Sequence, residues 1–523
     1  MMRIVDSDLW EIYDLRIGRV YWRANLGQCP EDSAGSLVEW ALAQRGHWAA
    51  VVENSDGIFG ITDNLRSFPI LYTLNGDLLV SSTPTPLMGE IDSPRLDTIS
   101  AREFLESGYL LGSQSLIAGV SSVTAGTVSN LQSGEVVDSY RMPTEYEESD
   151  AEPLDYMKYF YEVVLQQFEP LAASGRQLVV PLSGGADSRL ILLALKEVGA
   201  SNVFTFTYGV PGSPEVRISK QVAKSAGYQW RGIELNRTKV HKLWLQPQTG
   251  DFLRATWSGE ALPHIQDWYA LHELKTDSKV DKDAVILPGH TIVGNEHDDE
   301  LIFSGRLSIR GVADLITTHH FNQRGKTKVT ELPSSLQTKI RQFLEEKWEP
   351  RNSARNSQAL VELNLITRQA RYINNSMRGY EYFGYDWALP MLTADSWETW
   401  LAGPRALHTA DRRYYIDFIN RKFERTFGSD IDYFMPRAGK IEPERKRKIK
   451  SVLSAVGLLN LLTNLARIRT ERHHPMAFEA LAGKLTQREF EIKLLRGYRT
   501  LGIYSELFIA NEWVPGQRVV PEG

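Results

Sequence analysis

The stretch VVPLSGGADSRLILLALKEVGA at 179–200 constrains the fold more than any other part of the sequence. Residues 177–182 are apolar enough to form a central β-strand, and an amphipathic helix is predicted to begin near Asp187. The apolar residues that share one face of this helix are Leu190, Leu193, Ala194 and Val198. Gly199 is a natural stop for it. A strand that runs directly into a helix indicates an α/β domain.

Six residues, Ser-Gly-Gly-Ala-Asp-Ser at 183–188, join this strand to this helix. The two glycines permit a positive φ and a close approach of the backbone to a ligand. Backbone N–H groups and the helix N-terminus form an anion-binding nest, to which Ser183 and Ser188 add hydroxyl donors. Asp187 alone would repel an anion, but it fits a site where Mg²⁺ bridges carboxylate and phosphate. The alternative is a tight turn that needs glycine and nothing more.

The sequence on either side divides into two parts. Residues 1–140 contain short strand-like runs separated by turn signals. A polar stretch at 141–153 is predicted to be a linker. From 154 to 510, helices alternate with β-branched runs, which predicts a parallel sheet, and the chain is mostly helical after about 330. Residues 511–523 are expected to be a frayed tail.

Charge and cysteine content exclude several classes of protein. A net charge of −6 and a pI of about 6.1 argue against nucleic-acid binding. No signal peptide is recognised, and no apolar run reaches the ~18 residues of a membrane span. The single cysteine, Cys29, excludes an internal disulfide and suits a reducing cytosol, so we expect a cytoplasmic protein. Cys29 itself is expected to be a small apolar filler.

The motif at 183–188 resembles the PP-loop of the ATP pyrophosphatases, and VFTFTYGVPGSPEVRISKQVAKSAGY at 203–228 resembles the segment that follows it in asparagine synthetases. The resemblance implies an α/β PP-loop (adenine nucleotide α-hydrolase-like) domain that uses ATP and Mg²⁺, with the adenine held at the end of the second strand. The residues that it implies for the nucleotide are Leu182, Ser183, Gly184, Gly185, Asp187, Ser188, Thr207, Tyr208, Gly209, Pro288 and Gly289.

The stretches 46–82 and 99–126 resemble the second half of the glutaminase domain of the same family and the helix and strand that close it, which implies an α+β Ntn-hydrolase-like sandwich. Such a glutaminase needs Cys as its first mature residue, with the free α-amino group as the base. Met1 and Met2 stand there instead, and the segment before Gly46 is short for the family's glutamine-binding elements. We therefore expect a truncated, inactive domain, with nitrogen supplied by ammonia, by a separate glutaminase or by an amine on the substrate.

Two registers match the third nucleotide element, DAVILPGHTIVGNEHDDELIFSG at 283–305. One places His290 over the family's catalytic Glu, after Pro288-Gly289; the other places Glu296 there. We prefer the first, because strand ends position ligands, and we assign the second metal carboxylate to Asp298 or Asp299. The alternative for the acids is a solvated loop.

The basic stretch at 436–451 matches the region from which the family takes a lysine for the α-phosphate. Lys446 and Lys448 are the candidates, and a solvated basic helix is the alternative. The stretches at 261–275 and 368–404 resemble a branch that converts sugar uronates into uronamides in surface-polysaccharide synthesis. Trp257, His264, Gln266 and Asp267 are the candidate substrate residues, against the alternative of a buried polar helix start.

The resemblance thus implies an ATP-dependent ligase that adenylates a small-molecule or glycan carboxylate and transfers it to ammonia or an amine. Lasso-peptide cyclases and β-lactam synthetases, which close an amide within one molecule, are an alternative in the same family. A tRNA-modifying enzyme and a catalytically inactive ATP-binding homologue are two further alternatives. The sequence does not decide between a monomer and a homodimer.

Overall fold

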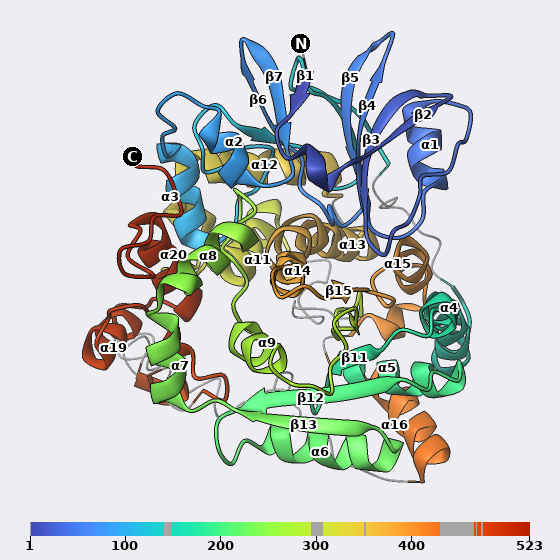
Figure 1. Ribbon diagram of the computed structural model, residues 1–523. Coiled ribbons are helices and arrows are strands. Elements are labelled where there is room, and N and C mark those ends of the chain that lie inside the picture. Colours follow the sequence, from blue (N-terminus) through green and yellow to red (C-terminus); the bar gives the residue numbers. More distant parts are fainter. Residues whose placement is uncertain are drawn as a thin grey trace.

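The computed structural model describes residues 2–140, 149–293, 307–349, 352–409, 411–428, 465–466, 468–471 and 474–523. Figure 1 shows two groups of strands at the N-terminal end of the molecule and a further sheet at the opposite end, with helices between them. Within the described ranges, no helix is long and apolar enough to cross a membrane.

Residues 2–140 form two sheets. The first has the order β1-β7-β6-β8, and only its β1–β7 pair is parallel; its strands are β1 (Met2–Ile4), β7 (Asp77–Ser81), β6 (Leu71–Asn75) and β8 (Ser121–Ser122). The second is antiparallel, in the order β10 (Val136–Ser139), β9 (Thr127–Asn130), β5 (Gly57–Thr62), β4 (Trp48–Asn54), β3 (Gly18–Ala24) and β2 (Glu11–Leu15). The predicted β-rich character is confirmed, while the relation to Ntn hydrolases stays a prediction.

The six-stranded sheet is buried on both faces, as the alternation along β4 shows. Ala49 and Val51 pack into the main core, whereas Trp48 and its alternate neighbours pack into a second cluster on the other face. Helix α1 (Leu37–Ala43) contributes Trp40 to that second cluster, where Trp22 stacks on Trp48 with ring centroids 5.1 Å apart. This sheet therefore holds the N-terminal part against the rest of the chain.

The sheet at the other end is parallel throughout, as predicted. Its order is β13 (Gln229–Glu234), β12 (Val203–Gly209), β11 (Leu178–Pro181), β14 (Val285–Ile286) and β15 (Asp386–Trp387). The chain moves from β11 outward to one side through β12 and β13, and later returns to the other side of β11 as β14. The carboxyl ends of β11 and β14 therefore lie at a topological switch point, which is the usual ligand crevice of an open α/β sheet.

The rest of the chain after residue 153 is mainly helical. The helices before residue 330 are α4 (Pro153–Ala173), α5 (Ala186–Glu197), α6 (Pro214–Ala226), α7 (Arg237–Trp244), α8 (Pro247–Thr256), α9 (Trp268–Leu274) and α11 (Ile309–His320). Those after it are α12 (Ser334–Lys347), α13 (Ser353–Asn364), α14 (Met377–Tyr382), α15 (Ala394–Leu401), α16 (Arg413–Phe427), α19 (Gln487–Leu495) and α20 (Thr500–Ile509). The predicted mainly helical C-terminal region is present in the described ranges. Two short helices at 84–89 (α2) and 98–107 (α3) belong to the N-terminal part.

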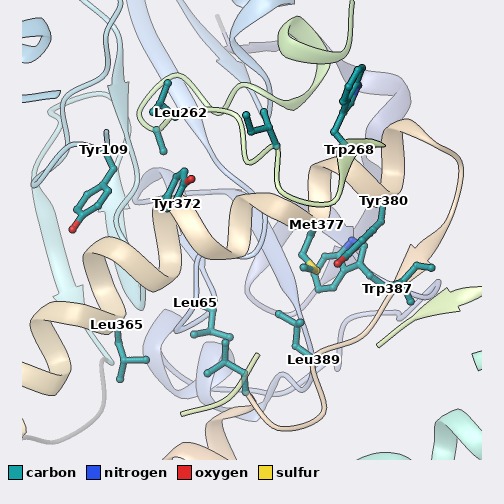
Figure 2. Packing of buried hydrophobic residues seen from close by; sticks show 14 of the residues in the cluster. Leu65, Tyr109, Leu262, Trp268, Leu365, Tyr372, Met377, Tyr380, Trp387 and Leu389 are labelled. Atoms are coloured by element: carbon teal, nitrogen blue, oxygen red, sulfur yellow. The ribbon is translucent and has the colours of Figure 1, made fainter. Parts of the chain in front are cut away.

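A π-helix, Leu365–Ile373, connects α13 to the segment that leads into α14. Figure 2 shows this helical run passing through the main core, with Leu365, Tyr372, Met377 and Tyr380 projecting from it. A π-helix adds residues to a turn and is frequent near functional sites, because it redirects side chains. Here Tyr372 packs against His264, with ring centroids 5.2 Å apart.

The C-terminal segment differs from the expected frayed tail. Trp513 is 2% exposed, and its indole N–H donates to the carbonyl of Leu481 at 2.7 Å. Trp244 donates to the carbonyl of Trp513 at 3.1 Å, and Val520 is also buried. The sequence of this segment is mostly polar, but its few apolar residues are buried. Most of the predicted linker, 141–148, lies outside the described residues, and α4 begins at Pro153.

Candidate active site

The turn at 183–188 follows β11 and leads into α5, as the sequence predicts. Its two serines bind each other: the hydroxyls lie 3.0 Å apart, and the Ser183 N–H donates to Ser188 Oγ at 3.1 Å. The Gly185 N–H donates to Ser183 Oγ, also at 3.1 Å. The hydroxyls that the sequence analysis assigned to a phosphate thus hold the turn itself in shape.

Glycine is needed in this turn for room rather than for a positive φ. Gly185 is the N-cap of α5 with φ −85°, so the expected left-handed backbone is wrong for this residue. A Cβ on Gly185 would lie only 3.3 Å from Ser183 Oγ, which is tighter than ordinary contact. Because no side chain fills this position, an anion can approach the N-terminus of α5 closely.

Asp187, the expected Mg²⁺ ligand, is already occupied by protein donors. Its carboxylate is paired with the guanidinium of Arg412 and accepts a hydrogen bond from the Tyr415 hydroxyl at 3.0 Å. Among the residues that the structure describes, no group of three or more His, Cys, Asp or Glu side chains could hold a metal ion. Asp298 and Asp299 lie outside those residues. The described side chains therefore do not fit a resident Mg²⁺ on Asp187.

The end of β12 lies beside the turn. The Thr207 hydroxyl donates to the carbonyl of Leu182 at 2.6 Å and accepts the indole N–H of Trp230 at 3.1 Å. A Cβ on Gly209 would lie 2.9 Å from a methyl carbon of Val216, so glycine lets α6 pack close to the strand. Thr207 therefore uses its side-chain hydroxyl within the protein.

The strand end after β14 converges on the same turn. A Cβ on Gly289 would lie 3.6 Å from both Asp187 Cβ and the Ser188 nitrogen. Pro288 and His290 flank this glycine; His290 is half-buried as a residue, and its Nδ1 is buried without a partner in the described structure. Burial, and then the nearby His264, lower the pKa of His290 to about 4, while the charge of Asp267 opposes the shift. His290 is therefore neutral at neutral pH.

Asp267 links the end of β12 to α14 through hydrogen bonds. Its carboxylate accepts hydrogen bonds from the hydroxyls of Tyr208 at the end of β12 and of Tyr380 on α14, the latter at 2.6 Å. The Gln266 amide donates to the Tyr208 hydroxyl at 3.3 Å. Burial, and then the charge of Asp267, raise the pKa of both tyrosines well above the ordinary value. Both phenols thus remain protonated donors.

The other two expected substrate residues, His264 and Trp257, differ in their burial. His264 lies against Tyr372, and burial followed by the charge of Arg368 lowers its pKa to about 4. His264 is half-buried as a residue. Trp257 is only 1% exposed and packs against Phe508, with ring centroids 5.7 Å apart. Trp257 is therefore a core residue in this structure, and not a surface on which a sugar can stack.

Four expected residues, Glu296, Asp299, Lys446 and Lys448, lie outside the described residues. Arg412, which the sequence analysis missed, provides a cation at the turn. It comes from the basic and aromatic run DRRYYIDF at 411–418. That run gives no local signal for this role, because only the packing of α16 on α5 brings it to Asp187.

The sequence has one cysteine, Cys29. Cys29 is exposed and lies 3.5 Å from the Tyr13 hydroxyl, so the expectation of a buried apolar filler is wrong. It lies in a loop between β3 and α1.

Comparison with known proteins gives one family and weak structural likenesses. Residues 164–249 match the family model described as Asparagine synthase. No curated protein matches the chain. A predicted subunit of a tRNA methyltransferase from Methanocaldococcus jannaschii is 19% identical, over 34% of this chain and 91% of that one, with a TM-score of 0.16. The NH3-dependent NAD synthetase from Campylobacter jejuni is 14% identical, over 44% of this chain and 97% of that one, with a TM-score of 0.19.

These TM-scores are too low to show a shared overall fold. The family match is more informative, because it runs from the second half of α4 through β11, the turn at 183–188, α5, β12, α6 and β13 to α7. The segment that forms the turn and the neighbouring strand end is thus similar to asparagine synthase.

Proposed function

We propose that the chain is an ATP-dependent amide-forming synthetase, which activates a carboxylate and transfers the acyl group to ammonia or another amine. The observation that supports this best is the position of the turn at 183–188. It lies at the switch point of a parallel sheet, between β11 and α5, inside the segment similar to asparagine synthase. A helix N-terminus at such a point favours the phosphates of a nucleotide.

The proposed reaction has two steps. A carboxylate oxygen bonds to the α-phosphorus of ATP, and the bond to the bridging oxygen breaks, which releases pyrophosphate and leaves an acyl-adenylate. The nitrogen lone pair then attacks the carbonyl carbon, a base accepts the proton, and AMP leaves with the electrons of the broken acyl–oxygen bond. The Mg²⁺ of this reaction belongs to the MgATP substrate, where it neutralises phosphate charge.

His290 is the described residue that we propose as proton acceptor. It follows Gly289, which lies against the turn, and its neutral imidazole has a lone pair available at neutral pH. Glu296 is the alternative acceptor. Lys446 and Lys448 remain the proposed lysines for the α-phosphate, beyond the described residues.

The proposed substrate is a sugar uronate, which would become a uronamide in surface-polysaccharide synthesis in the cytoplasm. Hydrogen-bonding groups on Gln266, Asp267 and His264 support a polar substrate. We further propose that the N-terminal part does not hydrolyse glutamine, because the one cysteine of the sequence, Cys29, lies within the chain between β3 and α1 and so carries no free α-amino group.

The test is incubation of the full chain with ATP, Mg²⁺, ammonium and a panel of nucleotide-linked uronates and uronate glycans. The proposal predicts AMP and pyrophosphate in equal amounts, together with a product lighter than the acid by a single mass unit. Reactions without ammonium or without the acid are the controls. Release of ADP, or of no pyrophosphate with any carboxylate, would contradict the proposal. A peptide product that has lost water would identify a cyclase instead.

A further inference from the structure

Arg412 contacts Asp187 of the turn at 183–188, although 225 residues separate the two in sequence. One guanidinium nitrogen donates to Asp187 Oδ1, and the other terminal nitrogen lies 3.4 Å from Oδ2. The Tyr415 hydroxyl donates to the same Oδ1, and the ring of Tyr415 lies under the guanidinium at 4.7 Å. This arrangement fixes the plane of the guanidinium as well as its position.

The backbone holds Arg412 in an unfavourable conformation. It is the N-cap of α16 with φ +53°, in the left-handed region that is unfavourable for a residue with a Cβ. Helix α16 packs against α5, the helix that carries Asp187. The fold therefore imposes this placement, and strained residues of this kind are concentrated at functional sites.

The pair has unused capacity for an anion. An arginine has five N–H donors, of which two face Asp187, and the Nε of Arg412 is buried with no hydrogen-bond partner in the described structure. The side chains of Arg412 and Asp187 are 24% and 26% exposed, so a ligand can reach them. Asp187 alone would repel a phosphate, but the ion pair carries no net charge, and its fork of donors suits phosphate oxygens.

We propose that Arg412 binds a phosphate of the nucleotide, and that Asp187 is the positioning residue that orients it, in place of a role for Asp187 as a metal ligand. The inference rests on the proposed function, because it assumes a nucleotide at the turn. It assigns one cation of the site to the N-terminus of α16, outside the segment that matches asparagine synthase.

The experiment compares Arg412→Gln with Arg413→Gln in the full chain. Arg413 is the adjacent arginine, is exposed, and lies over Tyr414 at 4.8 Å, so its variant has the same change of charge away from the turn. Calorimetry measures the binding of ATP and of adenosine, each in Mg²⁺ and in EDTA. Arg412→Gln should weaken ATP binding by about tenfold or more in both conditions, since a charge-assisted hydrogen bond contributes more than 1.4 kcal/mol. Adenosine binding should be unchanged.

A double-mutant cycle tests the positioning role of Asp187. Asp187→Asn should weaken ATP binding in EDTA in the wild type, but not in the Arg412→Gln background, because it acts through Arg412. A metal ligand would instead change only the Mg²⁺-dependent affinity, in both backgrounds, and that result would overturn the positioning role.

Several results would overturn the role of Arg412. ATP binding that is equal in the Arg412→Gln and Arg413→Gln proteins would do so, as would tighter binding in the Arg412→Gln protein. If Arg412→Gln also loses adenosine, Arg412→Lys decides, since it keeps the charge but not the fork: weakened ATP binding with intact adenosine binding supports the inference, and unchanged ATP binding overturns it. A wild-type chain that binds neither ligand refutes the proposed function itself.

Discussion

Glu260 joins the two parts of the chain and is the residue whose replacement we expect to destabilise it most. Its carboxylate binds Arg66 of the N-terminal part at 2.7 Å and Arg371 of the π-helix at 2.6 Å. The carboxylate is fully buried, and the two arginine side chains are 1% and 2% exposed. Burial lowers the pKa of Arg66 to about 10, while the charge of Glu260 opposes that shift. Two buried cations thus depend on one buried anion.

The perturbation is Glu260→Gln, which keeps the shape but removes the charge and turns one acceptor into a donor that faces a guanidinium. Removal of one partner of a buried ion pair costs about 3–5 kcal/mol, because an uncompensated charge is left in the interior. Arg66 keeps the carbonyl of Val123 and Arg371 keeps that of Gly112 as acceptors, so we expect one such cost and not two. The predicted loss of unfolding free energy is about 4 kcal/mol.

The assay is equilibrium urea unfolding followed by tryptophan fluorescence. Asp32→Asn is the matched control, because the Arg16–Asp32 pair is 3.5 Å long with 66% and 45% of its side chains exposed, and an exposed pair contributes at most about 1 kcal/mol. Replacement of Glu260 and both arginines by methionine should recover most of the loss. If Glu260→Gln costs no more than Asp32→Asn, the reasoning on the buried triad is refuted.

Three other predictions follow from the described contacts. The pKa values of His264 and His290 are about 4 in the folded chain, against 6.5 in the unfolded chain, so acidification protonates the unfolded chain first. Each histidine should therefore remove about 2 kcal/mol of unfolding free energy between pH 6.5 and pH 5. A protein with His264→Asn and His290→Asn should lose less unfolding free energy over that range in pH-dependent urea titrations. Ser188→Ala removes the acceptor of the Ser183 N–H, so it should lower the unfolding free energy by about 1–3 kcal/mol in denaturation experiments and weaken ATP binding in calorimetry. An unchanged unfolding free energy and ATP affinity would show that the serine pair does not shape the turn. Trp513→Ala should lower the unfolding free energy by about 3–5 kcal/mol, whereas a frayed tail would give no change.

The sequence by itself determined the elements whose signals are local. The apolar run before 183, the helical spacing after it and Gly199 predict β11 and α5 closely, and Gly199 takes the expected left-handed φ of +74°. Alternating strands and helices predict a parallel sheet, because such connections must cross over. The strand-end preference for His290 agrees with the proximity of Gly289 to the turn, although its catalytic role stays a prediction.

Only the tertiary structure decided which distant side chains meet. The ion pair of Arg412 with Asp187 depends on a strained residue and on the packing of α16, and Asp267 is flanked by tyrosines 59 residues before it and 113 after it. The sequence around Trp257 and Trp513 does not distinguish them from exposed aromatic residues, yet both are buried. Local sequence patterns specify secondary structure because side-chain directions repeat with a fixed period along a helix or a strand. Burial, charge pairing and pKa values depend instead on neighbours far away in the chain, which no short window of sequence contains.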